Sequence, residues 1–317
     1  MTANGNDMRG EKWRILCGSA AKRLVELPDA SIDCCVTSPP YWGLRDYGVE
    51  GQLGLEPTPA EYVERLVEVF REVRRVLKDD GTLWLNLGDS YVCGSQGSQG
   101  GTGQRAVRTF TATRVMRKDD IDGLAPKNLV GIPWRVAFAL QADGWYLRSD
   151  IIWAKPNPMP ESVTDRPTKA HEYLFLLSKS ERYYYDAGSI AEQASSFGLN
   201  GGGYEPPGQT PHATSRGVVA VDAPTTRNKR SVWTIPTEPF PGAHFAVMPT
   251  ALVKPCVLAG CRPGGTVLDP FTGSGTVCRV SVDNNCQFVG TELKPDYVRM
   301  AAARMAQDAF AFDIQQP

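Results

Sequence analysis

The stretch "VLDPFTGSGT", residues 267–276, decides the fold of this chain. An apolar run ends in an acid, Asp269, and two glycines, Gly273 and Gly275, follow before a helical pattern resumes. Glycines let the backbone turn tightly and approach a ligand, and the N-terminus of the following helix offers unpaired N–H groups. The order of strand, glycine-rich turn and helix predicts a ligand-binding corner of an α/β sheet.

A second carboxylate, Glu292, ends the next strand-like run, 286–293. A carboxylate at this place can accept hydrogen bonds from both hydroxyls of a ribose. The sequence lacks the G-x-G-x-x-G fingerprint of pyrophosphate binding. Asp269 precedes the glycine turn, where its carboxylate would meet a cationic or hydrogen-bond-donating group of the ligand. This favours a nucleoside that carries an amino acid, such as S-adenosylmethionine, over NAD. The alternative is a simple tight turn between strand and helix.

Strand and helix patterns alternate towards both ends of the chain, which favours a doubly wound, mostly parallel sheet. Helices are also expected after the glycine turn and at the end of the chain. The expected strands are 13–18, 31–38, 82–91, 145–155, 171–180, 265–271 and 286–293, and the other expected helices are 19–28, 126–144 and 57–81, the last closed by an Asp-Gly stop.

Two segments, 94–125 and 187–230, are rich in glycine and polar residues, and each carries several Arg or Lys. We expect them to be insertions above the sheet of a single domain, 1–317, because structured patterns resume after each. The first would be a flexible basic segment, and the second the target-recognition segment. A linker between two domains is the alternative.

Composition limits the classes of function. The net charge of −1 means that any nucleic-acid binding must use a local basic face. No run approaches the ~18 apolar residues of a membrane span, and the start "MTANGNDMRGEKW" is not a secretory signal. For the same reason we expect no membrane partner. The eight cysteines form no C-x-x-C pair, so we expect reduced thiols in a cytoplasmic protein, with no metal site and no disulfide framework.

A proline corner follows the strand pattern 31–38. It consists of Ser38, Pro39, Pro40 and Tyr41, in the run "TSPPYW". Proline cannot continue a central strand, so the chain turns sharply and presents carbonyl acceptors without competing N–H donors. The alternative is a plain strand end with Tyr41 packed in the core.

"DPFTGSGT" and "TSPPYW", in this order along the chain, resemble the cofactor and catalytic motifs of the beta-type amino-methyltransferases of DNA. The resemblance implies a circularly permuted, seven-stranded methyltransferase sheet. In this sheet the strand 13–18 would form one side of the binding site for the adenine of S-adenosylmethionine. It also implies a prokaryotic or phage origin. Cofactor contacts would come from Asp269, Phe271, Gly273, Ser274, Gly275, Thr276 and Glu292, and from His244 and Phe245 in the upstream segment "HFAVMP" (244–249).

The resemblance also assigns the proline corner a chemistry. An exocyclic amine is a poor nucleophile because its lone pair is delocalised into the base. Ser38 and the carbonyl of Pro39 would accept its two N–H groups, while Tyr41 stacks on a base flipped out of double-stranded DNA. A clamp that begins with Ser favours cytosine N4, whereas Asp or Asn is usual for adenine N6.

The alternatives are N6-adenine methylation, RNA methylation and a non-catalytic DNA-binding regulator. Methylation of glutamine amides ranks far behind, since that related family has Asn at the position of Ser38. A cognate restriction endonuclease is the expected functional partner.

Overall fold

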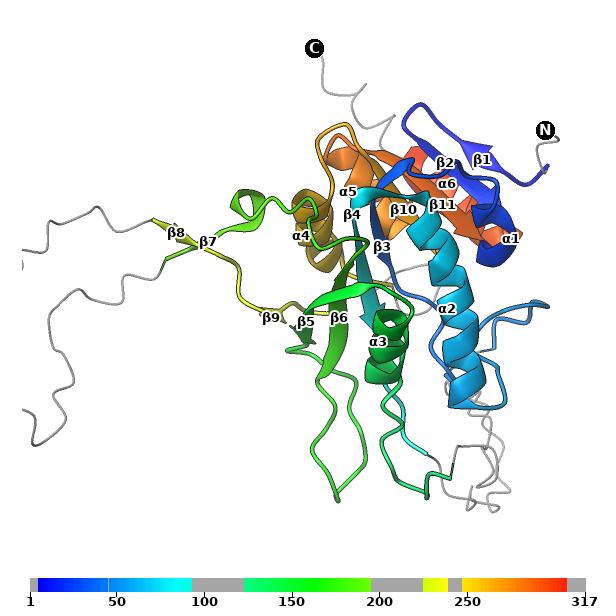
Figure 1. The fold of residues 1–317 in the computed structure, drawn as a ribbon. Helices are drawn as coiled ribbons and strands as arrows, with labels where there is room; N and C mark the ends of the chain where they lie inside the picture. The colour runs from blue at the N-terminus through cyan, green and yellow to red at the C-terminus, as the bar shows by residue number, and fades with distance from the viewer. Residues whose placement is uncertain (1–4, 45, 93–122, 195–224, 239–246, 307–317) are drawn as a thin grey trace, which may run out of the picture.

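The computed structural model describes residues 5–44, 46–92, 123–194, 225–238 and 247–306 (Figure 1). Most of the insertion 94–125 and the middle of 187–230 lie outside the described residues, as do His244 and Phe245. Those expectations therefore stay predictions.

Within the described residues the main sheet has nine strands (Figure 1). Strands β2, β11, β10, β3 and β4 are parallel neighbours, β6 is antiparallel to β4 and β5, and the short β1 and β9 extend the two edges. All seven expected strands are present, but the expected count of seven is wrong because the two short edge strands join them. In spatial order the strands are β1 (Met8–Arg9), β2 (Trp13–Cys17), β11 (Gln287–Glu292), β10 (Thr266–Asp269), β3 (Ile32–Thr37), β4 (Leu77–Leu87), β6 (His171–Ser178), β5 (Tyr146–Ala154) and β9 (Val232–Thr234).

Three helices cover each face of the sheet, which confirms the doubly wound α/β class (Figure 1). Cys35 of β3 packs in the core beneath one helical layer, and its neighbour Cys34 packs in the core beneath the other. One layer consists of α1 (Ala20–Leu24), α2 (Pro59–Val76) and α3 (Ile132–Ala142), and the other of α4 (Thr250–Gly260), α5 (Thr276–Asp283) and α6 (Pro295–Ala306).

The helix α2 ends earlier than the sequence pattern predicted. The Thr58 side chain caps its start by accepting from the Glu61 N–H, and Leu77 ends it with an extended backbone. Strand β4 begins at Leu77 itself and pairs with Ile32 of β3. The expected Asp-Gly stop at 80–81 is therefore wrong, because these residues lie inside β4.

The strand order places a switch point between β3 and β10. From β10 the chain crosses to β11 on one side, and from β3 it crosses to β4 on the other. Ligands of open α/β sheets bind in the crevice that such a reversal leaves at the carboxyl ends of the strands. That edge carries the ends of β3, β10 and β11, where the proline corner, the glycine turn and Glu292 lie.

Smaller elements complete the described chain. A 3-10 helix, η2 (Gly188–Ile190), precedes a two-stranded sheet of β7 (Glu192–Gln193) and β8 (Thr226–Arg227) at the two ends of the second insertion. The described cysteines are buried and form no disulfide with one another. No helix in the described part of the chain is long and apolar enough to cross a membrane.

Candidate active site

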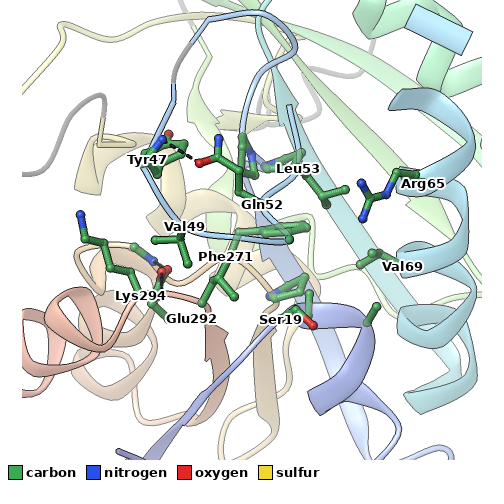
Figure 2. A pocket seen from close by; sticks show the side chains of 18 of the residues that line it. Ser19, Tyr47, Val49, Gln52, Leu53, Arg65, Val69, Phe271, Glu292 and Lys294 are labelled. Carbon is green, nitrogen blue, oxygen red and sulfur yellow. Dashed lines mark hydrogen bonds between the residues drawn. The ribbon is translucent and has the colours of Figure 1, made fainter. Parts of the chain in front are cut away.

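A cavity of about 200 Å³ opens at the carboxyl edge of the sheet (Figure 2). Its walls come from segments far apart in the sequence: the start of α1, the proline corner, α2, the glycine turn, the end of β11 and a loop over 46–54. In Figure 2 the side chains of Ser19, Phe271 and Glu292 gather around this space, with Arg65 and Val69 of α2 on one side. All four residues predicted for catalysis line the cavity, together with Phe271, Gly273 and Glu292 from the cofactor motif.

Asp269 supports the cavity from behind. It is 2% exposed, and its Oδ1 accepts hydrogen bonds from the Thr37 hydroxyl at 2.6 Å and from the Phe271 N–H at 3.0 Å. Burial raises the pKa of Asp269 to about 7. The carboxyl group therefore joins the end of β3 to the glycine turn. Its expected direct contact with a ligand stays a prediction.

The glycine turn divides into a part that faces the cavity and a part that packs against α6. Gly273 has a left-handed backbone with φ +53° and donates its N–H to Glu292 Oε2 at 2.9 Å. Gly275 begins α5 with φ +81°, and a Cβ there would lie 2.9 Å from the Cβ of Ala301 in α6. Glycine is therefore needed at position 275, because any larger side chain would collide with Ala301 where α5 packs on α6.

Ser274 and Thr276 also lie on the packing side. Both are buried, and Arg304 Nη1 donates to the Thr276 hydroxyl at 3.0 Å and approaches the Ser274 carbonyl at 3.5 Å. Among the described residues these two and Gly275 do not line the cavity. The structure gives their part of the motif a role in joining α5 to α6.

Glu292 faces the cavity at the end of β11. Its two carboxylate oxygens accept from the N–H groups of Gly273 and Lys294, at 2.9 and 2.8 Å. Burial raises the pKa of Glu292, and these backbone donors oppose that rise. Each oxygen keeps a lone pair, so the carboxylate can still accept hydrogen bonds from a pair of hydroxyls.

The proline corner is built around the hydroxyl of Tyr41. The Ser38 hydroxyl donates to Tyr41 Oη at 3.4 Å, and Tyr41 Oη lies 3.0 Å from Asn86 Oδ1 and 2.7 Å from Glu172 Oε2. The Tyr41 ring packs on Gly88, where a Cβ would come within 2.5 Å of it. These contacts fix the ring at the cavity wall.

Two residues of this network, Asn86 and Glu172, were missed by the sequence analysis. Asn86 comes from β4, while Glu172 and Lys155 come from the β5–β6 hairpin and its edge and form an ion pair. Glu172 is the one acid in the expected strand 171–180 ahead of its apolar run, which is the signal that could have found it.

A loop over residues 46–54 covers one side of the cavity. The Tyr47 N–H donates to the Gln52 side chain at 2.8 Å (Figure 2). The Tyr47 ring meets the ring of Tyr297 in α6 edge to face. At the base of the loop, Gly43 N–H donates to the Gly54 carbonyl at 2.8 Å. The aromatic edges and the glutamine amide give this wall both apolar and polar groups.

A sheet edge with a glycine-rich turn, a buried glutamate and a proline corner around one cavity is the arrangement of an S-adenosylmethionine-dependent methyltransferase. The chain belongs to the DNA methylase family, whose model matches residues 32–303. This confirms the family named from the two motifs, and with it S-adenosylmethionine as the methyl donor.

Several relatives are similar over almost the whole chain. Type II methyltransferase M.Cfr9I of Citrobacter freundii is 50% identical over 288 residues, which cover 91% of this chain and 86% of the relative. Type II methyltransferase M.SmaI of Serratia marcescens is 49% identical over 292 residues, or 92% of this chain and 90% of the relative.

Solved structures share the fold. PvuII DNA methyltransferase, named as cytosine-N4-specific, has a TM-score of 0.62 at 19% identity and covers 93% of this chain and 86% of its own. A putative DNA modification methylase from Thermus thermophilus, solved with S-adenosyl-L-methionine, has a TM-score of 0.58 at 22% identity, covering 92% of this chain and 93% of its own.

Proposed function

We propose that this protein methylates the exocyclic N4 of cytosine in double-stranded DNA. The observation that carries the choice of base is Ser38 at the head of the proline corner, with its hydroxyl at the cavity wall beside Tyr41. The fold neighbour named for cytosine N4 accords with this choice, but its low identity supports only the fold. The base therefore rests on Ser38.

The residues of the cavity divide into two groups in this proposal. Phe271, Gly273 and Glu292 hold the donor, with the carboxylate of Glu292 accepting from its ribose hydroxyls. The donor supplies an electrophilic methyl group on sulfur. Ser38 and the Pro39 carbonyl accept the two N–H groups of the amine, which favours a pyramidal nitrogen with a localised lone pair.

Tyr41 provides the platform on which the flipped base stacks. Its ring is already fixed on Gly88 and by its hydroxyl contacts. Positioning of this kind is the main catalytic contribution of a site that brings two reactants together.

We also propose that the enzyme acts beside a cognate restriction endonuclease. The similar proteins named above are called Type II methyltransferases, a name that belongs to restriction–modification systems. Methylation would protect the host's own recognition sites, which requires that both proteins read the same DNA sequence.

The test is incubation of unmethylated genomic DNA with the protein and S-adenosylmethionine, followed by nucleoside mass spectrometry. N4-methylcytosine is the expected product, and Tyr41→Ala should abolish most of it while the cofactor still binds in calorimetry. Tyr146→Ala, at an exposed tyrosine on β5, is the control and should behave as wild type. N6-methyladenine would keep the site but overturn Ser38 as the residue that selects the base. No methylated nucleoside would favour RNA or a regulator.

A further inference from the structure

We propose that Glu172 is the final proton acceptor of a hydrogen-bonded relay that runs from Ser38 through the Tyr41 hydroxyl. This role rests on the proposed methylation of an exocyclic amine at this site. Glu172 acts through Tyr41, so it is a positioning residue for Ser38 as well as an acceptor.

The relay is continuous in the structure. Ser38 Oγ donates to Tyr41 Oη at 3.4 Å, and Tyr41 Oη donates to Glu172 Oε2 at 2.7 Å. Asn86 Oδ1 lies 3.0 Å from the same phenol oxygen, and its amide is oriented by a bond from Nδ2 to the Tyr173 carbonyl. The phenol therefore faces two acceptors and one donor, which sets the direction of its hydrogen.

This direction determines what Ser38 can do. Because its only hydrogen points at Tyr41, its lone pairs are left to accept from the amine. Burial, and then the carboxylate of Glu172, raise the pKa of Tyr41 well above its usual value, so the phenol keeps its proton at neutral pH. Tyr41 can give up that proton only as it receives the one from Ser38.

The methylation step then balances. The amine nitrogen forms a bond to the methyl carbon, and the electron pair of the breaking carbon–sulfur bond stays on sulfur. The nitrogen becomes a cation and gives one proton to Ser38 Oγ. The Ser38 proton moves to Tyr41 Oη and the Tyr41 proton to Glu172, which becomes a neutral acid. No further reactant is needed.

The charges around Glu172 suit an acceptor that releases its proton to water. Lys155, the residue directly after β5, pairs with its Oε1, and the two side chains are 17% and 15% exposed, so they lie at the edge of solvent. Lys169, whose Nζ donates to the Asp89 carbonyl, lies on the same side; burial lowers the pKa of its ammonium group, and the charges of Asp89 and Glu172 oppose that shift. Tyr41 is the uncharged neighbour.

The first experiment compares Glu172→Gln with wild type in single-turnover methylation of unmethylated genomic DNA across a range of pH. Because proton transfer to a positioned group contributes on the order of 100-fold or more, we expect a rate loss of that size. The pH profile of the rate should differ between the variant and wild type, because the amide of the variant cannot take up the proton that the carboxylate accepts. Its affinity for S-adenosylmethionine should be unchanged in calorimetry.

A second variant, Tyr41→Phe, keeps the ring and removes the hydroxyl. It should lose as much rate as Glu172→Gln, and the double variant should lose no more, since both break one relay. Glu72→Gln is the matched control, because Glu72 pairs with Arg75 on α2, outside this network. It should behave as wild type. Additive losses in the double variant would overturn the relay.

A readout without donor or DNA separates this inference from the proposed function. In ¹³Cζ-tyrosine NMR of the free protein, Tyr41 should titrate at lower pH in Glu172→Gln than in wild type, because the neighbouring negative charge is gone. If wild type methylates DNA but the Gln variant keeps its rate and pH profile, the relay is wrong and the function stands. If wild type makes no methylated base, the proposed function fails, and the catalytic relay fails with it even where NMR shows the contact.

Discussion

The Thr37 hydroxyl donates to Asp269 Oδ1 at 2.6 Å across a sequence separation of 232 residues. Thr37→Val keeps the shape of the side chain and removes this donor to a buried carboxyl. We expect a loss of about 1–3 kcal/mol in the free energy of unfolding by urea. Thr82→Val is the control, since Thr82 is equally buried but its hydroxyl meets only the thiol of Cys34 at 3.6 Å. Equal losses of unfolding free energy in the two variants would show that the bond from Thr37 to Asp269 adds no stability of its own.

The raised pKa of Asp269 predicts that this carboxyl group lowers the stability of the fold as pH rises, and that Asp269→Asn removes this dependence. An unfolded aspartate ionises near pH 4, whereas in the fold the pKa is about 7. Between these values the folded state holds a proton that the unfolded state has lost, so stability falls as pH rises, by roughly 1.4 kcal/mol per pH unit at most. The melting temperature of the variant, relative to wild type, should therefore rise from pH 5 to pH 8. A constant difference would contradict the raised pKa.

Gly88→Ala tests the support of the Tyr41 ring. The added Cβ would come within 2.5 Å of the ring, so the ring must move. Because a shift of about 1 Å in a reacting group costs on the order of 100-fold in rate, turnover should fall far more than cofactor affinity. Gly5→Ala, where a Cβ meets nothing within 4 Å, is the control. Unchanged turnover in the Gly88 variant would mean that the ring position does not matter.

Much of the fold followed from the sequence because its strands are short apolar runs with clear ends. Asp80-Gly81 lies inside β4 and does not end α2, because the pairing of β4 with β3 overrides local turn chemistry. Helix α4 was not expected, because Pro255 lies inside it and hides its period. The edge strands β1 and β9 have only two or three residues and no pattern to find.

Residues that line the cavity could be predicted where a motif carried them, whereas contacts between distant segments could not. Ser38 and Glu292 stand in motifs and line the cavity. Glu172 reaches Tyr41, and Lys155 reaches Glu172, only because β6 pairs with β4 and with β5, neighbour relations that single-strand patterns do not encode. Thr276 also matches the cofactor motif, but its side chain bonds Arg304 and does not line the cavity, so its expected contact with the cofactor stays a prediction.

A comparison of alanine substitutions at Gly275 and Gly264 tests whether the glycine turn is needed for helix packing. Both have a left-handed backbone, with φ +81° and +78°, but a Cβ at Gly275 would lie 2.9 Å from Ala301, whereas one at Gly264 meets open space. Gly264→Ala should cost about 1–2 kcal/mol for the backbone alone. Gly275→Ala should cost a further 1–3 kcal/mol, roughly, for overpacking. Equal losses in urea unfolding would remove the helix contact as the reason for Gly275.

Glu292→Gln should weaken binding of S-adenosylmethionine. The amide keeps one acceptor oxygen and loses the charge, so the affinity in calorimetry should fall about 10- to 100-fold, the worth of one or two charge-assisted hydrogen bonds. Glu64→Gln, at an exposed position on α2, should bind as wild type does. Wild-type affinity in the Glu292 variant would remove this carboxylate from the cofactor site.

Strand β3 has consequences for the synthesis of the chain. All six of its residues are buried, and it pairs on one side with β4, made soon after it, and on the other with β10, made more than 200 residues later. Until residues 266–269 leave the ribosome, β3 is an open apolar edge, the kind of strand through which partly made chains join one another. Pairing at such separation also slows refolding. Strand β10 leads into the glycine turn that lines the cavity. Its synthesis therefore completes the cavity and also ends the period in which nascent chains can aggregate through β3.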